Sequence, residues 1–485
     1  MTRRTLSLAL ALLAGGCSMV PHLDRPAAPV PESWPVGDAY LKQSEASLAH
    51  VDYRDVFKDA RLQQVIEAAL ANNRDLRIAA ANIDAARAQF TIARSAELPK
   101  VGVSASVTES DSGTGRTNAN GSPVVGGART NYAINTNLSA FEIDLFGRVR
   151  AQSEAAQNRY FASEAGARAT RLSLVANVAQ AWLTLAADRT LLAIAKQTVA
   201  NTEQRLGLVK ARLDAGIAPR SDYTQAQSIL ATAQADVANQ TTLVAQDLNA
   251  LTLLVGAGVD DALLPGSIDE TDGQLAELPA GLSSDILLRR PDVVQAEYQL
   301  RAANAEVGAA RAALFPLVSL TAAGGLASNG LSRLFTGGAF NYSVTPSVSY
   351  SIFQGGAAKA GLRQSKADRE AAIATYEKAI QTAFREVADA LARRGTIDDQ
   401  LAANRLQVTA AGESARLSEA RYKGGIDPFL TSLDAQRTLY AAERTLVAAR
   451  LAKAANLVTL YRVLGGDSQL DATKAGPEPI AAPQP

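Results

Sequence analysis

The chain has 485 residues with 48 basic and 48 acidic side chains, so it lacks the basic surplus typical of a nucleic-acid-binding protein. One Cys excludes an internal disulfide, and both His lie in the irregular N-terminal stretch, at residues 22 and 50, which argues against a Cys/His metal site and against Ser-His or Cys-His catalysis. Aromatic residues make up only 5%, which indicates that apolar area is stored in long Ala- and Leu-rich helices rather than in a large core.

The first 16 residues have the pattern of an export signal. Two arginines precede an apolar run, and two glycines then lead directly to Cys17. The run is too short to span a bilayer, so we expect residues 1–16 to be a signal peptide that is removed. The site resembles a bacterial lipoprotein processing site, which implies lipid on Cys17, and Ser18 then favours the outer membrane. A plain secretory signal with an incidental Cys is the alternative. Residues 17–60 are expected to form a lipid-anchored, proline-rich tether.

The remainder of the sequence contains an internal repeat. Residues 211–217 recur as residues 420–426, at an offset of about 209. Shorter pairs follow the same relation, such as residues 145–147 with 352–354. We therefore expect a first repeat over residues 61–255, an equatorial linker over 256–284, a second repeat over 285–466 and a C-terminal tail over 467–485.

Two segments in each repeat alternate apolar and small polar residues. The clearest covers residues 340–352, and its partner over residues 317–323 is weaker and glycine-rich. In the first repeat the segments cover residues 101–107 and 132–145, the latter with a one-place slip before Phe141. A soluble sandwich would show the same alternation. The Ser, Thr and Asn at the polar positions favour membrane strands around a wet lumen.

Four such strands cannot close a barrel, because membrane barrels need at least eight. An open edge in lipid leaves backbone groups unpaired. We therefore expect the chain to oligomerise, and the sequence alone does not choose between two copies and three.

Each repeat then predicts a long helical hairpin. The first long helix is expected from about residue 148 to 213 and the second from about 356 to 423, each on the order of 100 Å long. Glycine and proline follow both, and second arms are expected over residues 220–254 and 428–464. An apolar stripe that repeats every seven residues along the first long helix predicts coiled-coil packing. The stripe consists of Val178, Leu185, Leu192, Val199, Leu206 and Leu213.

The signal, the duplicated unit, and the segments 141–148 (FEIDLFGR) and 421–425 (RYKGG) together resemble the TolC-type outer-membrane efflux channels. The closer likeness is to the lipoprotein branch that serves resistance-nodulation-division pumps. The resemblance implies a mixed α and β fold, in which coiled-coil hairpins form a periplasmic barrel and a transmembrane β-barrel of four strands per chain is completed by trimerisation. It also implies a homotrimer in the outer membrane that extends into the periplasm and docks with a periplasmic adaptor and an inner-membrane transporter.

The resemblance places a periplasmic gate in the second hairpin, at Leu430 and Asp434. These residues are four apart and so lie on one helical face, and a trimer would arrange each as a ring of three. The first repeat has Gln225 where the second has Asp434. Without the resemblance, a solvated Asp on a polar helix face would be the simpler interpretation.

The resemblance also implies a tip latch at Asp222 and Tyr422, for which helix capping and stripe packing are the simpler roles. The related latch uses an Arg where Asp427 stands here, and Arg220 is a possible substitute. Four residues at the tips are implied to contact the adaptor: Gly216, Ile217, Gly425 and Ile426.

These features predict a passive exit duct for drugs or other small toxic compounds, not an enzyme, with no cofactor or metal besides the covalent lipid. No nucleotide motif is present, so the energy must come from the inner-membrane partner. The alternatives are the same fold used for protein secretion or metal-ion efflux, or a structural envelope lipoprotein without a channel. Two Met and two His offer little to soft metals.

Overall fold

The computed structural model describes residues 18–31, 33–35, 39–40, 52–111, 113, 127–276 and 284–480. The expected signal peptide and Cys17 lie outside these residues. The described chain forms two compact units. One contains residues 84–160 and 298–374 with the N-terminal residues up to 26, and the other contains residues 27–83, 161–297 and 375–485.

The elements of the first repeat occur in the order helix, strand pair, helical hairpin. They are α2 (Tyr53–Val56), α3 (Ala60–Asn72), α4 (Arg74–Ser95), β1 (Val101–Asp111), β2 (Ala128–Glu142), α5 (Arg148–Asp214) and α6 (Arg220–Val255). Two short 3-10 helices follow in the linker, η1 (Asp261–Leu263) and η2 (Ile268–Thr271).

The second repeat has the same order of elements. They are η3 (Ser284–Arg289), α7 (Pro291–Ala312), β3 (Leu317–Ser328), η4 (Leu331–Arg333), β4 (Phe340–Ser349), α8 (Ala357–Lys423) and α9 (Phe429–Val463), followed by the short strands β5 (Leu470–Ala472) and β6 (Pro477–Pro479). α7 begins at Pro291, and proline is suited to this position because the first residues of a helix have no helical acceptor for their amide hydrogens.

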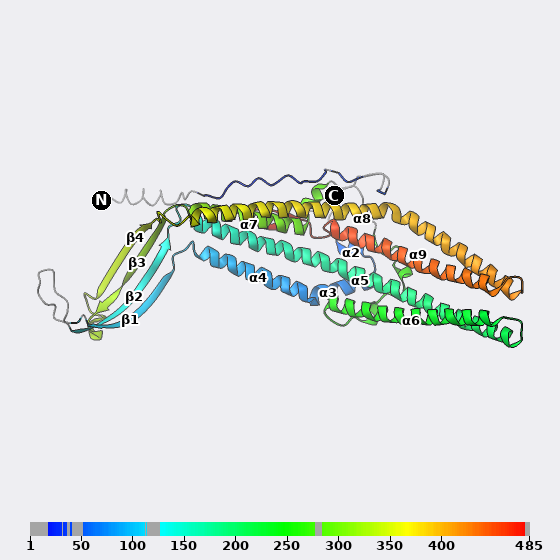
Figure 1. The fold of residues 1–485 in the computed structure, drawn as a ribbon. Coiled ribbons are helices and arrows are strands. Elements are labelled where there is room, and N and C mark those ends of the chain that lie inside the picture. Colours follow the sequence, from blue (N-terminus) through cyan, green and yellow to red (C-terminus); the bar gives the residue numbers. More distant parts are fainter. Residues whose placement is uncertain are drawn as a thin grey trace. The chain divides into compact units, whose positions relative to one another are not determined.

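The four longer strands form one antiparallel sheet in the order β1-β2-β3-β4 (Figure 1). The slip expected in the second strand is confirmed, since the pairing of β2 with β3 shifts between Leu138 and Phe141. Ala140 takes a positive φ of 42° at this bulge. β1 and β4 are the two edges of the sheet, and every residue of both strands is exposed.

Several strand ends differ from the sequence-based expectation. β1 continues to Asp111 and β3 to Ser328, because their small polar residues still pair in the ladder. β2 covers Ala128–Glu142 rather than residues 132–145. β4 ends at Ser349, three residues before Ile352. The alternation persists through Tyr350 and Ile352, but Ser349 pairs with Leu317, the first residue of β3, so the ladder between these two strands ends there.

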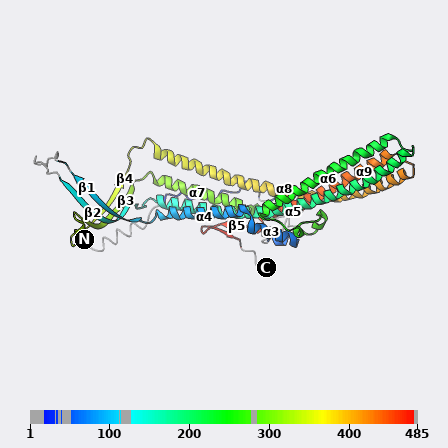
Figure 2. The same ribbon diagram turned by 90° about the horizontal axis from the view of Figure 1, so that it is seen from below.

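The two predicted hairpins are confirmed, with helix ends within about two residues of the expected positions. α5 and α8 have 67 residues each, which corresponds to a length on the order of 100 Å. Figure 2 shows α5 and α6 running beside α8 and α9 to their turns. Members of the apolar stripe lie on the packed side of the long helices, since Val178 and Leu185 on α5 and the equivalent Val387 on α8 are fully buried. None of the described helices is both long and apolar enough to cross a membrane.

The N-terminal residues lie against α7 as a strap without helix or strand. Asn304 donates its side-chain amide hydrogen to the carbonyl of Pro21 at 2.8 Å. Gly308 permits this approach, because a Cβ there would lie 2.6 Å from the side chain of Val20. In the other unit, Trp34 stacks on Phe384 with ring centroids 4.7 Å apart.

Candidate functional site

Each helical hairpin ends in the same short turn. α5 ends at Asp214 and α6 begins at Arg220, with Gly216 at φ 74° between them. The second hairpin repeats the turn with Gly425 at φ 73°. Glycine adopts a positive φ without the clash that a Cβ brings, so it reverses the chain directly after each long helix.

An exposed isoleucine follows each of these glycines. The amide of Ile217 donates to the carbonyl of Arg212, and the amide of Ile426 donates to that of Arg421, both at 2.9 Å. These bonds satisfy carbonyls that the ends of the helices leave free. The side chains are 72% and 66% exposed. The four positions expected to contact an adaptor therefore lie in the two turns, and the two isoleucines among them present apolar side chains outward.

A small apolar cluster joins the two hairpins behind the turns. Its buried members are Val209, Ala226, Tyr422, Phe429 and Leu433, one or more from each of the four helices. The Tyr422 and Phe429 rings lie 5.3 Å apart, and the guanidinium of Arg212 lies over the Tyr422 ring at 4.7 Å from its centroid. The packing role considered for Tyr422 is thus present within one chain.

The expected gate residues point away from this cluster. Phe429 and Leu433 are 3% and 7% exposed, whereas Leu430, one position further along α9, is 57% exposed. Asp434 is exposed as well, and it lies on the same helical face as Leu430 because the two are four residues apart. Among the described residues, the Asp434 carboxylate forms no ion pair. Gln225, its counterpart in the first hairpin, is also exposed.

The two residues expected to form the latch each carry a polar side-chain group without a hydrogen-bond partner among the described residues. The Tyr422 hydroxyl is buried and makes no hydrogen bond to any described residue. Asp222 is half-buried in the first turn of α6, and among the described residues its carboxylate accepts no hydrogen bond. The capping role considered for Asp222 is absent, because Pro219 is the N-cap residue of α6 and no side chain caps the helix.

Asp427 is used within its own turn. Its carboxylate accepts two hydrogen bonds from Arg421, at 2.6 and 2.9 Å. These bonds lower the pKa of Asp427. Arg220, considered as a substitute for the missing latch arginine, is exposed at the start of α6.

Above the apolar cluster lies a cavity of about 290 Å³ between α5, α6 and α9. Polar side chains contribute to its lining, among them Thr202, Thr232, Asp236 and Tyr440. The Tyr440 hydroxyl donates to Asp236 at 2.9 Å. Burial, with Asp236 as acceptor, raises the pKa of Tyr440 to about 12. The interface between the hairpins is therefore apolar near the turns and includes polar contacts further along the helices.

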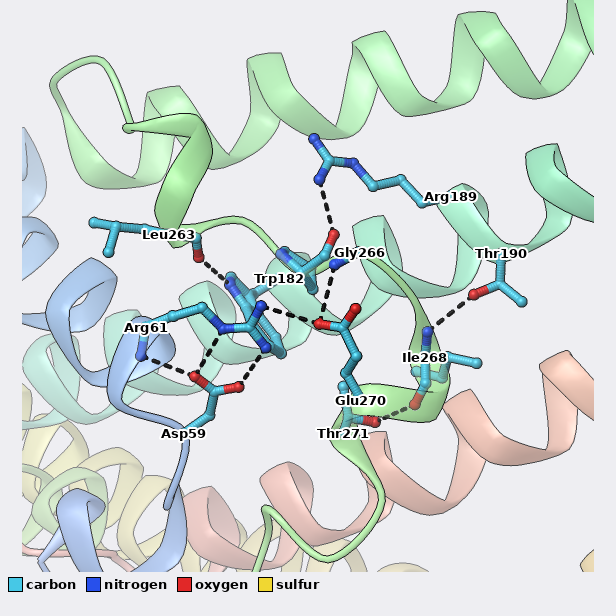
Figure 3. A network of polar contacts seen from close by, with 11 residues as sticks. Asp59, Arg61, Trp182, Arg189, Thr190, Leu263, Gly266, Ile268, Glu270 and Thr271 are labelled. Atoms are coloured by element: carbon cyan, nitrogen blue, oxygen red, sulfur yellow. Dashed lines mark hydrogen bonds and ion pairs between the residues drawn. The ribbon is translucent and has the colours of Figure 1, made fainter.

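A polar network fixes the linker to the middle of the first hairpin (Figure 3). Arg61 at the start of α3 binds Asp59 and also Glu270 of the linker, the latter at 3.0 Å. On α5, Trp182 donates its indole hydrogen to the carbonyl of Leu263 at 3.0 Å. Further bonds run from Arg189 to the carbonyl of Pro265 at 2.8 Å and from the amide of Ile268 to Thr190 at 2.9 Å. None of these side chains was singled out from the sequence.

Two aspartates meet between α5 and α6 near this network. Burial raises the pKa of Asp247 to about 7, and a hydrogen bond and charge repulsion from Asp188 contribute to the shift. One oxygen of Asp247 is buried without a partner among the described residues. Asp247 is therefore partly protonated at neutral pH.

The described residues include no group of three or more His, Cys, Asp or Glu that could hold a metal ion.

Known proteins share this architecture. The sequence profile of the outer membrane efflux protein family matches residues 65–257 and 282–466. The chain is 43% identical over 471 residues to the probable efflux pump outer membrane protein TtgC of Pseudomonas putida, with 96% of each chain covered. It is 38% identical over 460 residues to the outer membrane protein OprJ of Pseudomonas aeruginosa, with 95% of each covered.

Solved structures agree. The open state of the MtrE outer membrane channel of Neisseria gonorrhoeae matches with a TM-score of 0.83 at 35% identity, over 94% of this chain and 100% of that one. The CmeC outer membrane channel of Campylobacter jejuni matches with a TM-score of 0.84 at 25% identity, over 93% and 96%.

The hairpins and sheet thus define a channel of the outer membrane that extends into the periplasm. The chain belongs to the outer membrane efflux proteins, a family of transport proteins. The family resemblance, the fold class and the location inferred from the sequence are confirmed.

Proposed function

We propose that the chain is one third of a homotrimeric exit duct in a tripartite efflux pump. The observation that carries this proposal is the open sheet, whose edge strands β1 and β4 each pair on one side only within the described part of the chain. Unpaired backbone groups in lipid cost several kcal/mol each, so both edges need partners from other copies. Three copies supply twelve strands, an even number within the range of known outer-membrane barrels.

The gate of this duct lies at Leu430 and Asp434. Both side chains point away from their own hairpin core, as side chains facing a central axis would. Three copies bring three leucines and three carboxylates together, which forms an apolar constriction beside an acidic ring. Carboxylates held close together repel one another, so a cation between them would hold the ring closed.

The latch consists of Asp222 and Tyr422. A buried hydroxyl without a partner costs about 1–3 kcal/mol, so a partner on a neighbouring hairpin would stabilise the closed tip. Among the described residues, the carboxylate of Asp222 accepts no hydrogen bond, so it is free to accept one from a neighbouring hairpin.

The tip docks a periplasmic adaptor, through Gly216, Ile217, Gly425 and Ile426, and an inner-membrane resistance-nodulation-division transporter supplies the energy. Exposed apolar side chains at a rigid turn are well suited to burial against a partner protein. The names of the relatives refer to efflux of toluene, solvents and antibiotics. We propose that this chain exports small toxic organic compounds of the same kind.

Cys17 carries the lipid anchor, and no other cofactor is needed. The strap places Met19 beside the last turn of α7, where Arg311 donates to its carbonyl at 3.5 Å. Acyl chains on a residue two positions earlier would enter the adjacent leaflet.

The assembly is tested by native mass spectrometry of detergent-extracted protein, where we expect a trimer. A purely monomeric protein would contradict the proposal, because four strands cannot insert alone. The role is tested by deleting the gene and measuring tolerance to toluene and antibiotics. We expect lower tolerance, restored by the wild-type gene, whereas unchanged tolerance and unchanged accumulation of these compounds would contradict the proposed cargo.

A further inference from the structure

Charge is absent from the body of the sheet and from most of its flanks. Residues 101–108, 130–141, 317–332 and 334–358 contain no Asp, Glu, Lys or Arg. The register places the first residues of β1 and β3 and the last residues of β2 and β4 at one end of the sheet, where the chain passes to or from α4, α5, α7 and α8. Since the helices extend into the periplasm, this end lies at the periplasmic side of the membrane.

The four crossings at this end carry an excess of positive charge. Residues 94–100, 142–150, 311–316 and 350–363 contain seven basic side chains and three acidic ones. The opposite end, over residues 109–129 and 329–339, contains three basic and two acidic side chains. The excess therefore belongs to the periplasmic end and is not a general property of the sheet.

Three of the seven cations have a local role. Arg148 donates its Nε hydrogen to Glu142 at 2.9 Å, so this pair is internally neutral. Arg94 and Arg311 lie in the last turns of α4 and α7, where a cation is favoured by the helix dipole.

The other four cations have no such role. Lys100, Arg150, Lys359 and Arg363 are exposed, and within the described part of the chain they form no ion pair. Asp144 lies close to Arg150 but does not pair with its guanidinium. Its carboxylate instead accepts a hydrogen bond from the backbone amide of Arg150 at 2.9 Å.

Two of these cations stand where the helix dipole opposes them. Arg150 is the third residue of α5 and Lys359 the third residue of α8, and neither helix has an acidic residue in its first turn. Positive charge at a helix N-terminus is locally unfavourable. The same unfavourable placement occurs in both repeats, which indicates that these cations serve a partner outside the helix.

Exposed aromatic side chains mark the same level as a membrane interface. Tyr350 and Phe353 precede α8 and are 58% and 89% exposed, and Phe315 follows α7. Aromatic girdles lie at both rims of membrane barrels, at the depth of the lipid headgroups. Lys and Arg at this depth extend their charged ends into the headgroup region.

We propose that Lys100, Arg150, Lys359 and Arg363 form a cationic collar that binds the phosphate groups of anionic phospholipids in the periplasmic leaflet of the outer membrane. Electrostatic attraction between the collar and the leaflet would then add to the burial of the apolar strand residues in the membrane. Each Lys or Arg near an anionic surface contributes a modest attraction, and several together select anionic over zwitterionic headgroups. This inference needs the outer-membrane location of the family, but neither the gate nor the cargo proposed above.

The test uses the full-length protein in phosphatidylethanolamine vesicles that contain spin-labelled phosphatidylglycerol or spin-labelled phosphatidylcholine. Electron paramagnetic resonance measures the fraction of each label immobilised at the protein surface. We expect phosphatidylglycerol to associate about threefold more strongly than phosphatidylcholine at 0.1 M salt, and the preference to shrink at 1 M salt, where the screening length is about 3 Å.

The decisive variant is Lys100→Gln with Arg150→Gln and Lys359→Gln, for which we expect a ratio near one. The matched control neutralises three exposed lysines of the unit that contains residues 27–83, 161–297 and 375–485, which does not include the four-stranded sheet. Its substitutions are Lys58→Gln, Lys196→Gln and Lys474→Gln, and it should keep the wild-type ratio. If the collar variant fails to insert, the conservative set Lys100→Arg, Arg150→Lys and Lys359→Arg should insert and keep the preference, and Lys359→Gln alone should reduce it. Equal binding of both lipids by the wild type, or an unchanged ratio in the collar variant, would overturn the proposal.

Discussion

Arg212 of α5 lies over the aromatic ring of Tyr422 of α8, with its guanidinium carbon 4.7 Å from the ring centroid. The two residues are separated by 210 positions, and their contact joins the first hairpin to the second directly behind the turns. The same ring is buried in the apolar cluster, so the tip of one chain behaves as a single packed unit. Opening of the duct must therefore either move this unit as a whole or break this contact.

The first prediction separates the hydroxyl of Tyr422 from its ring. Tyr422→Phe keeps the packing and the cation contact, so the variant should fold and assemble as the wild type does. If the hydroxyl bonds to a neighbouring hairpin, its loss should lengthen channel openings in planar bilayers. Tyr422→Ala should instead lower stability by about 3–5 kcal/mol, because it leaves a cavity in the cluster. A Phe variant with wild-type open times would remove Tyr422 from the latch.

A second prediction concerns the linker network in Figure 3. Trp182→Phe removes the indole hydrogen bond to the carbonyl of Leu263 and should destabilise the chain by about 1–2 kcal/mol. We expect faster proteolysis within residues 256–276 than in the wild type. The comparison is Trp34→Phe, because Trp34 is also buried, at 6% exposed against 1% for Trp182. Wild-type protease resistance in the Trp182 variant would show that the bond does not hold the linker.

The aspartate pair predicts a pH dependence of stability. The pKa of Asp247 is about 7 in the folded chain and about 3.9 when unfolded, so between these values the folded state binds a proton that the unfolded state lacks. The free energy of unfolding should therefore fall as the pH rises from 4 to 7. Because Asp247 is partly exposed, we expect a decrease of about 1 kcal/mol.

Thermal unfolding followed by circular dichroism at pH 5 and pH 8 measures this effect. Asp247→Asn should be less sensitive to pH than the wild type, since its amide does not titrate in this range. An equally large pH effect in the Asn variant would assign the dependence to other groups.

The lipid anchor is tested by Cys17→Ser. The variant should incorporate no labelled palmitate, whereas the wild type should be labelled after processing. Labelling of the wild type on a residue other than Cys17, or no labelling at all, would support the plain secretory signal.

Local signals explain why much of the fold could be predicted. Gly216 and Gly425 end the long helices by their positive φ, and the period-two alternation near Leu138 and Phe141 marks the bulge in β2. These signals depend on neighbours in the sequence. The alternation was misleading beyond Glu142 and beyond Ser349, where it continues past the last residue that pairs with a neighbouring strand.

Contacts between distant segments could not be predicted in this way. Arg61 and Glu270 of the linker are 209 residues apart, and no spacing rule links them. The positions of Leu430 and Asp434 on an outward face follow from helical periodicity, but their proposed role at a gate came from the family resemblance. That the Asp222 carboxylate and the Tyr422 hydroxyl have no hydrogen-bond partner among the described residues became visible only in the structure.

The most direct test of the account is the single-channel conductance of Asp434→Ala in planar lipid bilayers. Its control is Gln225→Ala, which changes the equivalent exposed position of the first hairpin. The account predicts a higher conductance for Asp434→Ala than for the wild type, because the acidic ring is lost, and a wild-type conductance for Gln225→Ala. An unchanged conductance in Asp434→Ala, or an equal rise in both variants, would contradict a gate at this position.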